Sequence, residues 1–210
     1  MKRTGFDTMS PWLYPFYIML HPKDGFQELR ANKKTSASVV TVIVLAWLLG
    51  EVFYRSATAY DMNMFEEHQQ NLFRTAMTTV MMFAIVCVSN WCFCTLMDGK
   101  GRMLDICTVA AYALAPYVIV RFITTICSWF MAGDEQMFLT YAVTVITVWC
   151  FIIAFIGLSE IHEYTYSKTV LSVILTIVGL IIILFIMLML LTLFQQVFVF
   201  IRTIIMEAMY

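Results

Sequence analysis

The sequence predicts an all-helical integral membrane protein, and three observations carry that prediction. The 210-residue chain is 61% hydrophobic and only 13% charged, and its mean hydropathy is +0.83. These values leave too little polar surface for a water-soluble globule. The apolar residues also gather into five long runs separated by polar turns. We expect a membrane domain of five transmembrane helices (residues 37–194), an N-terminal interfacial segment (1–36) and a C-terminal amphipathic helix (195–210).

The N-terminal segment contains an apolar run that is too short to cross a bilayer. Residues 11–20 supply about half of the roughly 20 residues that a crossing needs. Aromatic side chains such as Trp12 and Tyr17 suit the headgroup zone of a membrane. Pro22 has the fixed φ that is favoured at the first position of a helix. We expect an in-plane segment and then a short helix from Pro22 to about Lys34.

Five stretches have the roughly 17 to 25 mostly apolar residues that can cross a hydrocarbon core about 30 Å thick. They cover residues 37–54, 75–97, 104–126, 137–158 and 170–194. The third is the least uniform, because Asp105 lies in its first turn and Arg121 near its far end. The orientation of every later helix therefore depends on whether this stretch crosses.

The basic residues are distributed unevenly between the two sides of these spans. Nine Lys and Arg residues belong to the N-terminal segment, the turn at residues 98–102 and the loop at 159–168, and four lie on the other side. Positively charged loops usually stay in the cytoplasm. We expect a plasma-membrane protein with its N-terminus in the cytoplasm and its C-terminus outside.

The residues after position 194 remain apolar but include a polar face. Its members, placed at 100° per residue over an arc of about 140°, are Gln195, Gln196, Arg202, Thr203 and Glu207. This pattern favours an amphipathic helix in the outer interface over a sixth span.

The turn after the second span is the most polar connection between spans. Asp98 follows the carboxyl end of a helix, where the helix dipole disfavours a carboxylate by about 0.3–1 kcal/mol. Lys100 or Arg102 can compensate locally, with Gly99 and Gly101 supplying the positive φ of a tight turn. Alternatively, Asp98 meets polar groups from other segments on the same side.

The predicted topology brings several polar residues to one membrane face. They are His21, Asp24, Asp98, Asp105, His162, Tyr164 and Lys168. Such a set can form a docking surface for a partner of complementary charge. It can also form a divalent-cation site, with Asp98, Asp105 and His162 as candidate ligands. Histidines and aspartates in loops are more often solvated, so we expect no metal and no cofactor.

Polar and helix-distorting residues also occur inside the spans. Pro116 lacks an N–H, and its ring pushes against the carbonyl of Tyr112, so we expect a kink that shapes packing or lines a pore. Asn90 is expected to form a hydrogen bond across helices. Glu51 can pair with Arg55 on its own helix; Arg121, near the outer end of another span, is the other candidate partner. Pro116 and Asn90, together with the acidic and imidazole groups at the inner membrane face, make a small-solute or ion transporter the alternative function.

Motifs for catalysis and for nucleic-acid binding are missing from the sequence. Residues 99–102 lack the glycine spacing of a phosphate loop, and residues 160–163 do not form the H-E-x-x-H pattern. The six cysteines fall in or beside apolar runs and lack the spacing of a structural zinc site. We expect no enzyme.

Several motifs, in their order along the chain, resemble those of a known family. They are His21-Pro-Lys-Asp-Gly-Phe26, Asn90-Trp91, Thr95-Leu-Met-Asp98-Gly99, Tyr112-Ala-Leu-Ala-Pro116, His162-Glu-Tyr164 and Lys168-Thr-Val170. The chain thereby resembles the Yip (Ypt-interacting protein) family of five-span membrane proteins, most closely its bacterial branch. Eukaryotic members act in vesicle traffic with Rab GTPases and have longer N-terminal regions.

The resemblance implies a non-enzymatic role as an accessory or scaffold protein. Bacterial relatives look like companions of sugar-uptake ABC transporters. The expected partners are membrane lipid, subunits of a carbohydrate ABC transporter bound at the cytoplasmic face, and a second copy of the chain.

Overall fold

The structure is a computed structural model that describes residues 10–32, 35–58 and 71–209. Over these residues the regular elements are helical, which confirms the predicted fold class. The helices are α1 (Tyr14–Leu20), α2 (Pro22–Ala31), α3 (Ala37–Ala57), α4 (Leu72–Leu96), α5 (Met103–Cys127), the short η3 (Gly133–Glu135), α6 (Gln136–His162) and α7 (Tyr166–Met209). Lys2, Arg3, Lys33 and Lys34, which the orientation prediction counted, lie outside the described residues.

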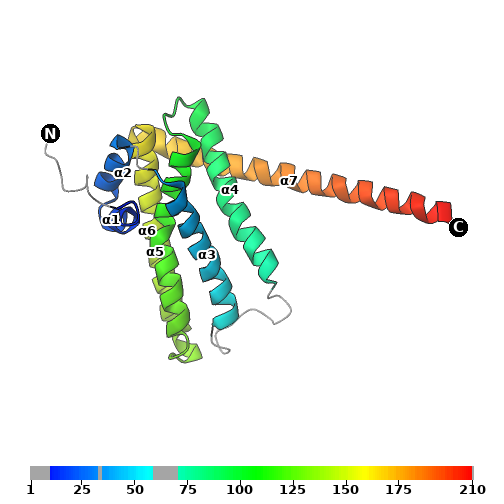
Figure 1. Cartoon of the computed structure of the whole chain (residues 1–210), viewed down its shortest axis with the longest axis horizontal. Coiled ribbons are helices and arrows are strands. Elements are labelled where there is room, and N and C mark those ends of the chain that lie inside the picture. The colour runs from blue at the N-terminus through cyan, green and yellow to red at the C-terminus, as the bar shows by residue number, and fades with distance from the viewer. Residues whose placement is uncertain (1–9, 33–34, 59–70, 210) are drawn as a thin grey trace.

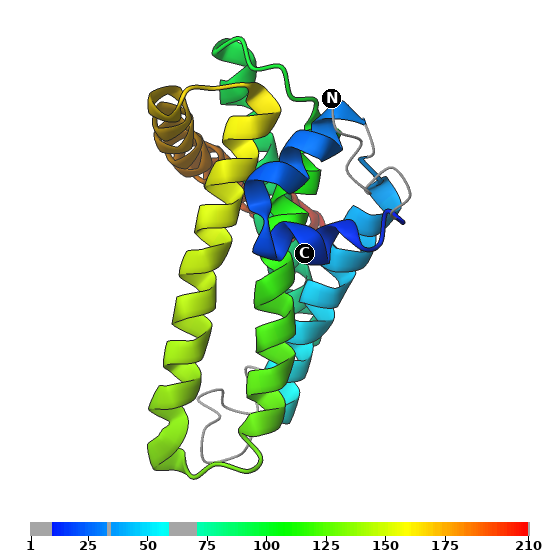
Figure 2. The same ribbon diagram turned by 90° about the vertical axis from the view of Figure 1, so that its left-hand side faces the viewer.

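Five of these helices are long and apolar enough to cross a membrane, so the five predicted spans are confirmed. They make the chain a multi-pass membrane protein. Helices α3 to α6 run alternately up and down as a bundle (Figures 1 and 2). α5 occupies its centre, in contact with α3, α4 and α6. The least uniform predicted span is therefore the most buried described one, since its small residues, including Ala111 and Ala113, allow close helix packing.

The bundle has one end that is rich in charged contacts, which we call the polar end. It consists of α2, the α4–α5 turn at residues 97–102, and the end of α6 with the following loop at residues 160–165 (Figure 1). The α5–α6 connection lies at the opposite end.

The N-terminal helices pack onto the bundle and do more than occupy an interface. Tyr14, Ile18, Phe26 and Leu29 are at most 1% exposed, and α1 and α2 lie across α5 and α6 near the polar end (Figure 2). A Cβ at Gly157 would come within 2.8 Å of the Phe26 ring. The missing side chain thus makes room for α2 on α6. α2 ends at Ala31, before the predicted end near Lys34, which is outside the described residues.

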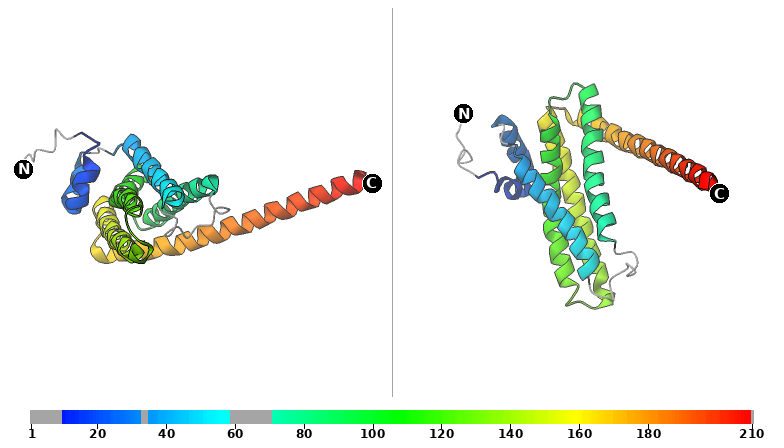
Figure 3. Two further views of the ribbon diagram at one scale, coloured as in Figure 1. Left: turned by 90° about the horizontal axis from the view of Figure 1, so that it is seen from below. Right: turned by 45° about the vertical axis from the view of Figure 1, so that its right-hand side comes forward.

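The predicted fifth span and the predicted C-terminal helix are one helix. α7 continues from Tyr166 to Met209, so the predicted boundary at residues 194–195 is not a helix boundary. The physical reason is that the sequence contains neither Pro nor Gly after Gly179. The first part of α7 packs on α4, and the rest extends away from the bundle (Figures 1 and 3).

Polar side chains join α4 to α7. The Asn90 amide donates to the Thr176 hydroxyl at 2.9 Å, and the Ser89 hydroxyl donates to the Thr176 carbonyl at 2.7 Å. Cys94 and Ser172 are 3.2 Å apart. The predicted hydrogen bond of Asn90 across helices is therefore confirmed.

A second polar contact lies toward the opposite end of the bundle. Arg121 of α5 pairs with Glu51 of α3 at 3.4 Å, and the Tyr117 hydroxyl donates to the same carboxylate at 2.8 Å. Of the two candidate partners of Glu51, which were Arg55 and Arg121, Arg121 is thus the one that forms this ion pair. α5 stays helical through Pro116, which is buried next to Ala115.

Candidate functional site

Three segments that are distant in sequence meet at the polar end. They are α2, the α4–α5 turn and the end of α6 with its loop. The contacts among them are hydrogen bonds, ion pairs and ring stacking, which fix the positions of the three segments relative to one another. This end is the candidate functional site.

Helices α4 and α6 end in the same backbone conformation. Asp98 and Glu163 both have φ of 58°, in the left-handed region. The next amide in each case turns back to the helix, from Gly99 to the Cys94 carbonyl at 2.7 Å and from Tyr164 to the Ser159 carbonyl at 3.0 Å. These bonds satisfy carbonyl groups at the helix ends.

The glycines of the turn have a different role from the predicted one. None of the described glycines has a positive φ, so the prediction for Gly99 and Gly101 was wrong. Glycine is required instead by close approach. A Cβ at Gly99 would lie 2.5 Å from the Tyr164 hydroxyl, and one at Gly101 would lie 2.7 Å from the His162 ring. The strained φ falls on Asp98, since aspartate tolerates this region better than most residues.

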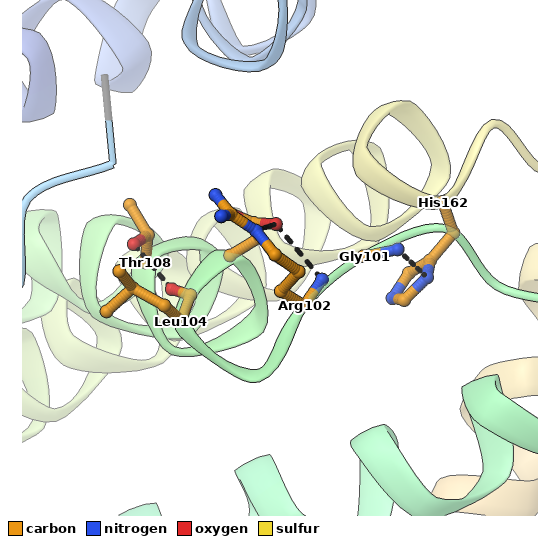
Figure 4. A network of polar contacts seen from close by, with 6 residues as sticks. Gly101, Arg102, Leu104, Thr108 and His162 are labelled. Atoms are coloured by element: carbon orange, nitrogen blue, oxygen red, sulfur yellow. Dashed lines mark hydrogen bonds and ion pairs between the residues drawn. The ribbon is translucent and has the colours of Figure 1, made fainter. Parts of the chain in front are cut away.

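His162 packs directly against the turn. The Gly101 amide donates to its Nδ1 at 3.3 Å (Figure 4). The side chain is buried, and its Nε2 has no hydrogen-bond partner among the described residues. Because Nδ1 accepts, the neutral ring carries its proton on Nε2. His162 is therefore a structural contact between α6 and the turn.

Tyr164 closes the carboxyl end of α4. Its ring stacks on His162 with centroids 5.1 Å apart, and its hydroxyl donates to the Cys94 carbonyl at 3.2 Å and the Met97 carbonyl at 3.5 Å. Burial, followed by the neighbouring Cys94, raises the pKa of Tyr164 to about 12. The hydroxyl therefore stays protonated and remains a donor at neutral pH.

Glu163 connects the loop to two cations. Its carboxylate pairs with Arg30 of α2 at 2.6 Å and with Lys100 of the turn. The hydrogen bond from Lys100, and then the charge of Arg30, lower the pKa of Glu163 below its usual range. Arg30 also donates to the Glu160 carbonyl at 2.7 Å, and the Gln27 amide donates to the Glu160 carboxylate at 3.0 Å. These bonds attach α2 to the end of α6.

Asp105 begins α5. Its carboxylate accepts from the Arg102 amide at 3.0 Å and pairs with the Arg102 guanidinium at 3.2 Å. An acidic residue in the first turn also complements the helix dipole. Asp105 thus serves helix capping.

The remaining predicted residues share the polar end but lie outside this network. His21 stacks on Tyr17 between α1 and α2, with ring centroids 5.1 Å apart. Asp24, Asp98 and Lys168 are exposed and form no ion pair with another described residue. Within the described ranges, no three His, Cys, Asp or Glu residues converge as metal ligands.

Sequence reasoning missed the residues that connect the three segments. They are Gln27, Arg30, Lys100, Glu160 and Glu163. No local signal marks them, because each partner is at least 63 positions away along the chain. The one available hint was that the predicted topology places all five on one side.

Comparison with known protein families gives a match over most of the chain. The family model described as the Yip1 domain matches residues 16–199, most of the chain. No curated protein and no solved structure matches the chain.

Proposed function

The chain belongs to the Yip1 domain family, and on that premise we propose that it is a non-enzymatic membrane accessory protein. It acts as a scaffold that docks a partner through the polar end. A subunit of a carbohydrate ABC transporter is the partner to test first, on the resemblance to bacterial relatives described above.

One observation carries the proposal: the polar end is held rigid while some of its charges remain on the surface. Buried and bridging groups such as His162 and Glu163 fix the segments to one another. Asp24, Asp98 and Lys168 are exposed beside them. A rigid surface with unpaired charges favours specific docking, because little conformational entropy is lost on binding.

Photo-crosslinking tests this docking directly. A photo-crosslinking residue replaces Asp98 or Lys168 in the full chain, and native membranes are irradiated before purification. We expect a transporter subunit to be crosslinked from both positions. The matched control position is Asp134, exposed at the opposite end of the bundle. Equal crosslinking from the control, or crosslinking only to a second copy of the chain, contradicts the assignment.

The proposal includes the orientation of the chain in the plasma membrane. We propose that the polar end faces the cytoplasm, which the excess of basic residues there supports. Intact cells are treated with a membrane-impermeant thiol reagent, using Lys100→Cys and Asp134→Cys variants and the unsubstituted chain as background. Labelling should occur at position 134 and not at position 100. The reverse pattern contradicts the orientation.

Transport of a small solute or ion is a second candidate, favoured by the Glu51–Arg121 pair. These side chains are 16% and 15% exposed, and Arg121 borders a cavity of about 170 Å³ lined partly by threonine hydroxyls. Charged groups inside spans often mark transport paths. Cation or sugar flux into vesicles that contain the chain, reduced by Asp98→Asn, supports transport. Flux equal to that of protein-free vesicles contradicts it.

A further inference from the structure

A cavity of about 390 Å³ opens at the polar end between α2, the start of α3, the α4–α5 turn and the end of α6. Three of its lining residues are cations from separate segments, namely Arg30, Lys100 and Arg102. We call it the basic pocket. Cations from distant parts of the sequence meet here because α2 is fixed onto α6 beside the turn.

The lining of the basic pocket carries an excess of positive charge. Its two carboxylates are Asp105 and Glu163, against three cations. Glu163 alone is shared by Arg30 and Lys100. The side chains of Arg30, Lys100 and Arg102 are 43%, 69% and 65% exposed. Each therefore keeps N–H groups that can bind an anion from the surrounding medium.

The N-terminus of α3 adds to this positive potential, and Thr35 lies two residues before it. The N-terminus of α5 also borders the pocket, but Asp105 already complements it. Ser36, at the N-cap of α3, makes no capping hydrogen bond through its side chain. Unsatisfied amides at helix N-termini favour anions, phosphate groups among them. The carboxyl end of α6 carries the negative pole of that helix, which would oppose the binding of an anion. Arg30 offsets it by donating a hydrogen bond to the Glu160 carbonyl.

The apolar surface that a ligand can use lies next to the pocket and not inside it. Leu29 and Ile161 line the pocket but are almost fully buried. The apolar spans of α3 and α5 begin at this level, so the pocket lies where the headgroup layer meets the hydrocarbon. A free inorganic ion uses only the charges of such a site. A phospholipid uses the charges for its phosphate and the adjoining apolar spans for its acyl chains.

We propose that the basic pocket binds the phosphate of an anionic phospholipid headgroup. Arg30, Lys100 and Arg102 contact the phosphate oxygens, and the apolar spans of α3 and α5 contact the acyl chains. This lipid site is independent of the docking proposed above, because it uses the pocket between the segments and not the exposed Asp98 and Lys168.

Native mass spectrometry of the purified full chain tests the proposal. The chain, in mild detergent, is titrated with phosphatidylglycerol or with phosphatidylcholine. We expect clear preference for phosphatidylglycerol, and binding about tenfold weaker in the R30Q/K100Q/R102Q triple variant. The matched control is Arg202→Gln, which removes an exposed cation on α7, far from the pocket.

A variant that should bind phosphatidylglycerol more strongly distinguishes a specific effect from a loss of binding caused only by misfolding. Glu163→Gln frees Arg30 and Lys100 from their shared carboxylate, so phosphatidylglycerol binding should become stronger. Preference that is unchanged in the triple variant, or equal binding of both lipids by the wild-type chain, overturns the proposal. Inorganic phosphate that displaces phosphatidylglycerol completely at equal concentration overturns the lipid assignment, because contacts of the acyl chains with the apolar spans would then contribute nothing.

Discussion

The hydroxyl of Tyr164 donates a hydrogen bond to the backbone carbonyl of Cys94, although the two residues lie 70 positions apart. The same carbonyl also accepts from the Gly99 amide at 2.7 Å. The loop after α6 therefore adds a distant donor to a helix end that is already capped locally.

Tyr164→Phe removes this donor and keeps the ring that stacks on His162. We expect the free energy of unfolding to fall by about 1 kcal/mol, the usual net value of one hydrogen bond. Unfolding by denaturing detergent measures the change. Tyr141→Phe is the control, because Tyr141 is 59% exposed on α6. Equal loss in both variants contradicts the capping role.

Gly99→Ala places a methyl group against the Cys94 carbonyl, 2.7 Å away, and against the Tyr164 hydroxyl. We expect a loss of about 1–3 kcal/mol in the free energy of unfolding, because the backbone on one side cannot move away easily. Gly50→Ala should be tolerated, since its Cβ meets the Phe122 ring at an ordinary 3.4 Å. The same unfolding assay compares the two. A neutral Gly99→Ala would show that the turn is loosely packed.

Asn90 and Thr176 should be energetically coupled. In a double-mutant cycle with Asn90→Ala and Thr176→Val, we expect a coupling free energy of about 0.6 kcal/mol, typical of hydrogen bonds between membrane helices. Thr192→Val replaces Thr176→Val in the control cycle, because the Thr192 hydroxyl bonds within its own helix. Additive effects of Asn90→Ala and Thr176→Val argue against the contact.

Acid should weaken the attachment of α2. The pKa of Glu163 is lowered in the folded chain, so its carboxylate contributes stability above its unfolded pKa. That contribution is lost as the pH falls through the lowered value. Glu163→Gln should therefore be less stable than the wild-type chain at pH 7, and this difference should shrink as the pH falls below the usual glutamate range, as measured by unfolding at each pH. A stability difference that stays constant with pH contradicts the prediction.

The spans could be predicted from hydropathy. The grouping at the polar end could be predicted because successive spans alternate in direction across the membrane. A run such as residues 137–158 needs no partner to be recognised as apolar. The meeting of the Asp98 turn with His162 was one of two readings that the sequence left open. The sequence favoured neither, because same-side placement does not fix a distance.

Other features depend on contacts that local sequence does not specify. The positive φ lies at Asp98 and not at the neighbouring glycines, since His162 and Tyr164 occupy the space beside Gly99 and Gly101. The burial of Phe26 likewise depends on the missing side chain of Gly157 on another helix. The three glycines in contact with other segments, Gly99, Gly101 and Gly157, were visible in the sequence, but their partners were not.

The length of α7 exceeds what one membrane crossing needs. Its 44 residues extend about 66 Å at about 1.5 Å per residue, roughly twice the thickness of a hydrocarbon core. Only its first part packs on α4, and the rest is continuous to Met209. The protein therefore presents a long apolar helix surface outside the four-helix bundle.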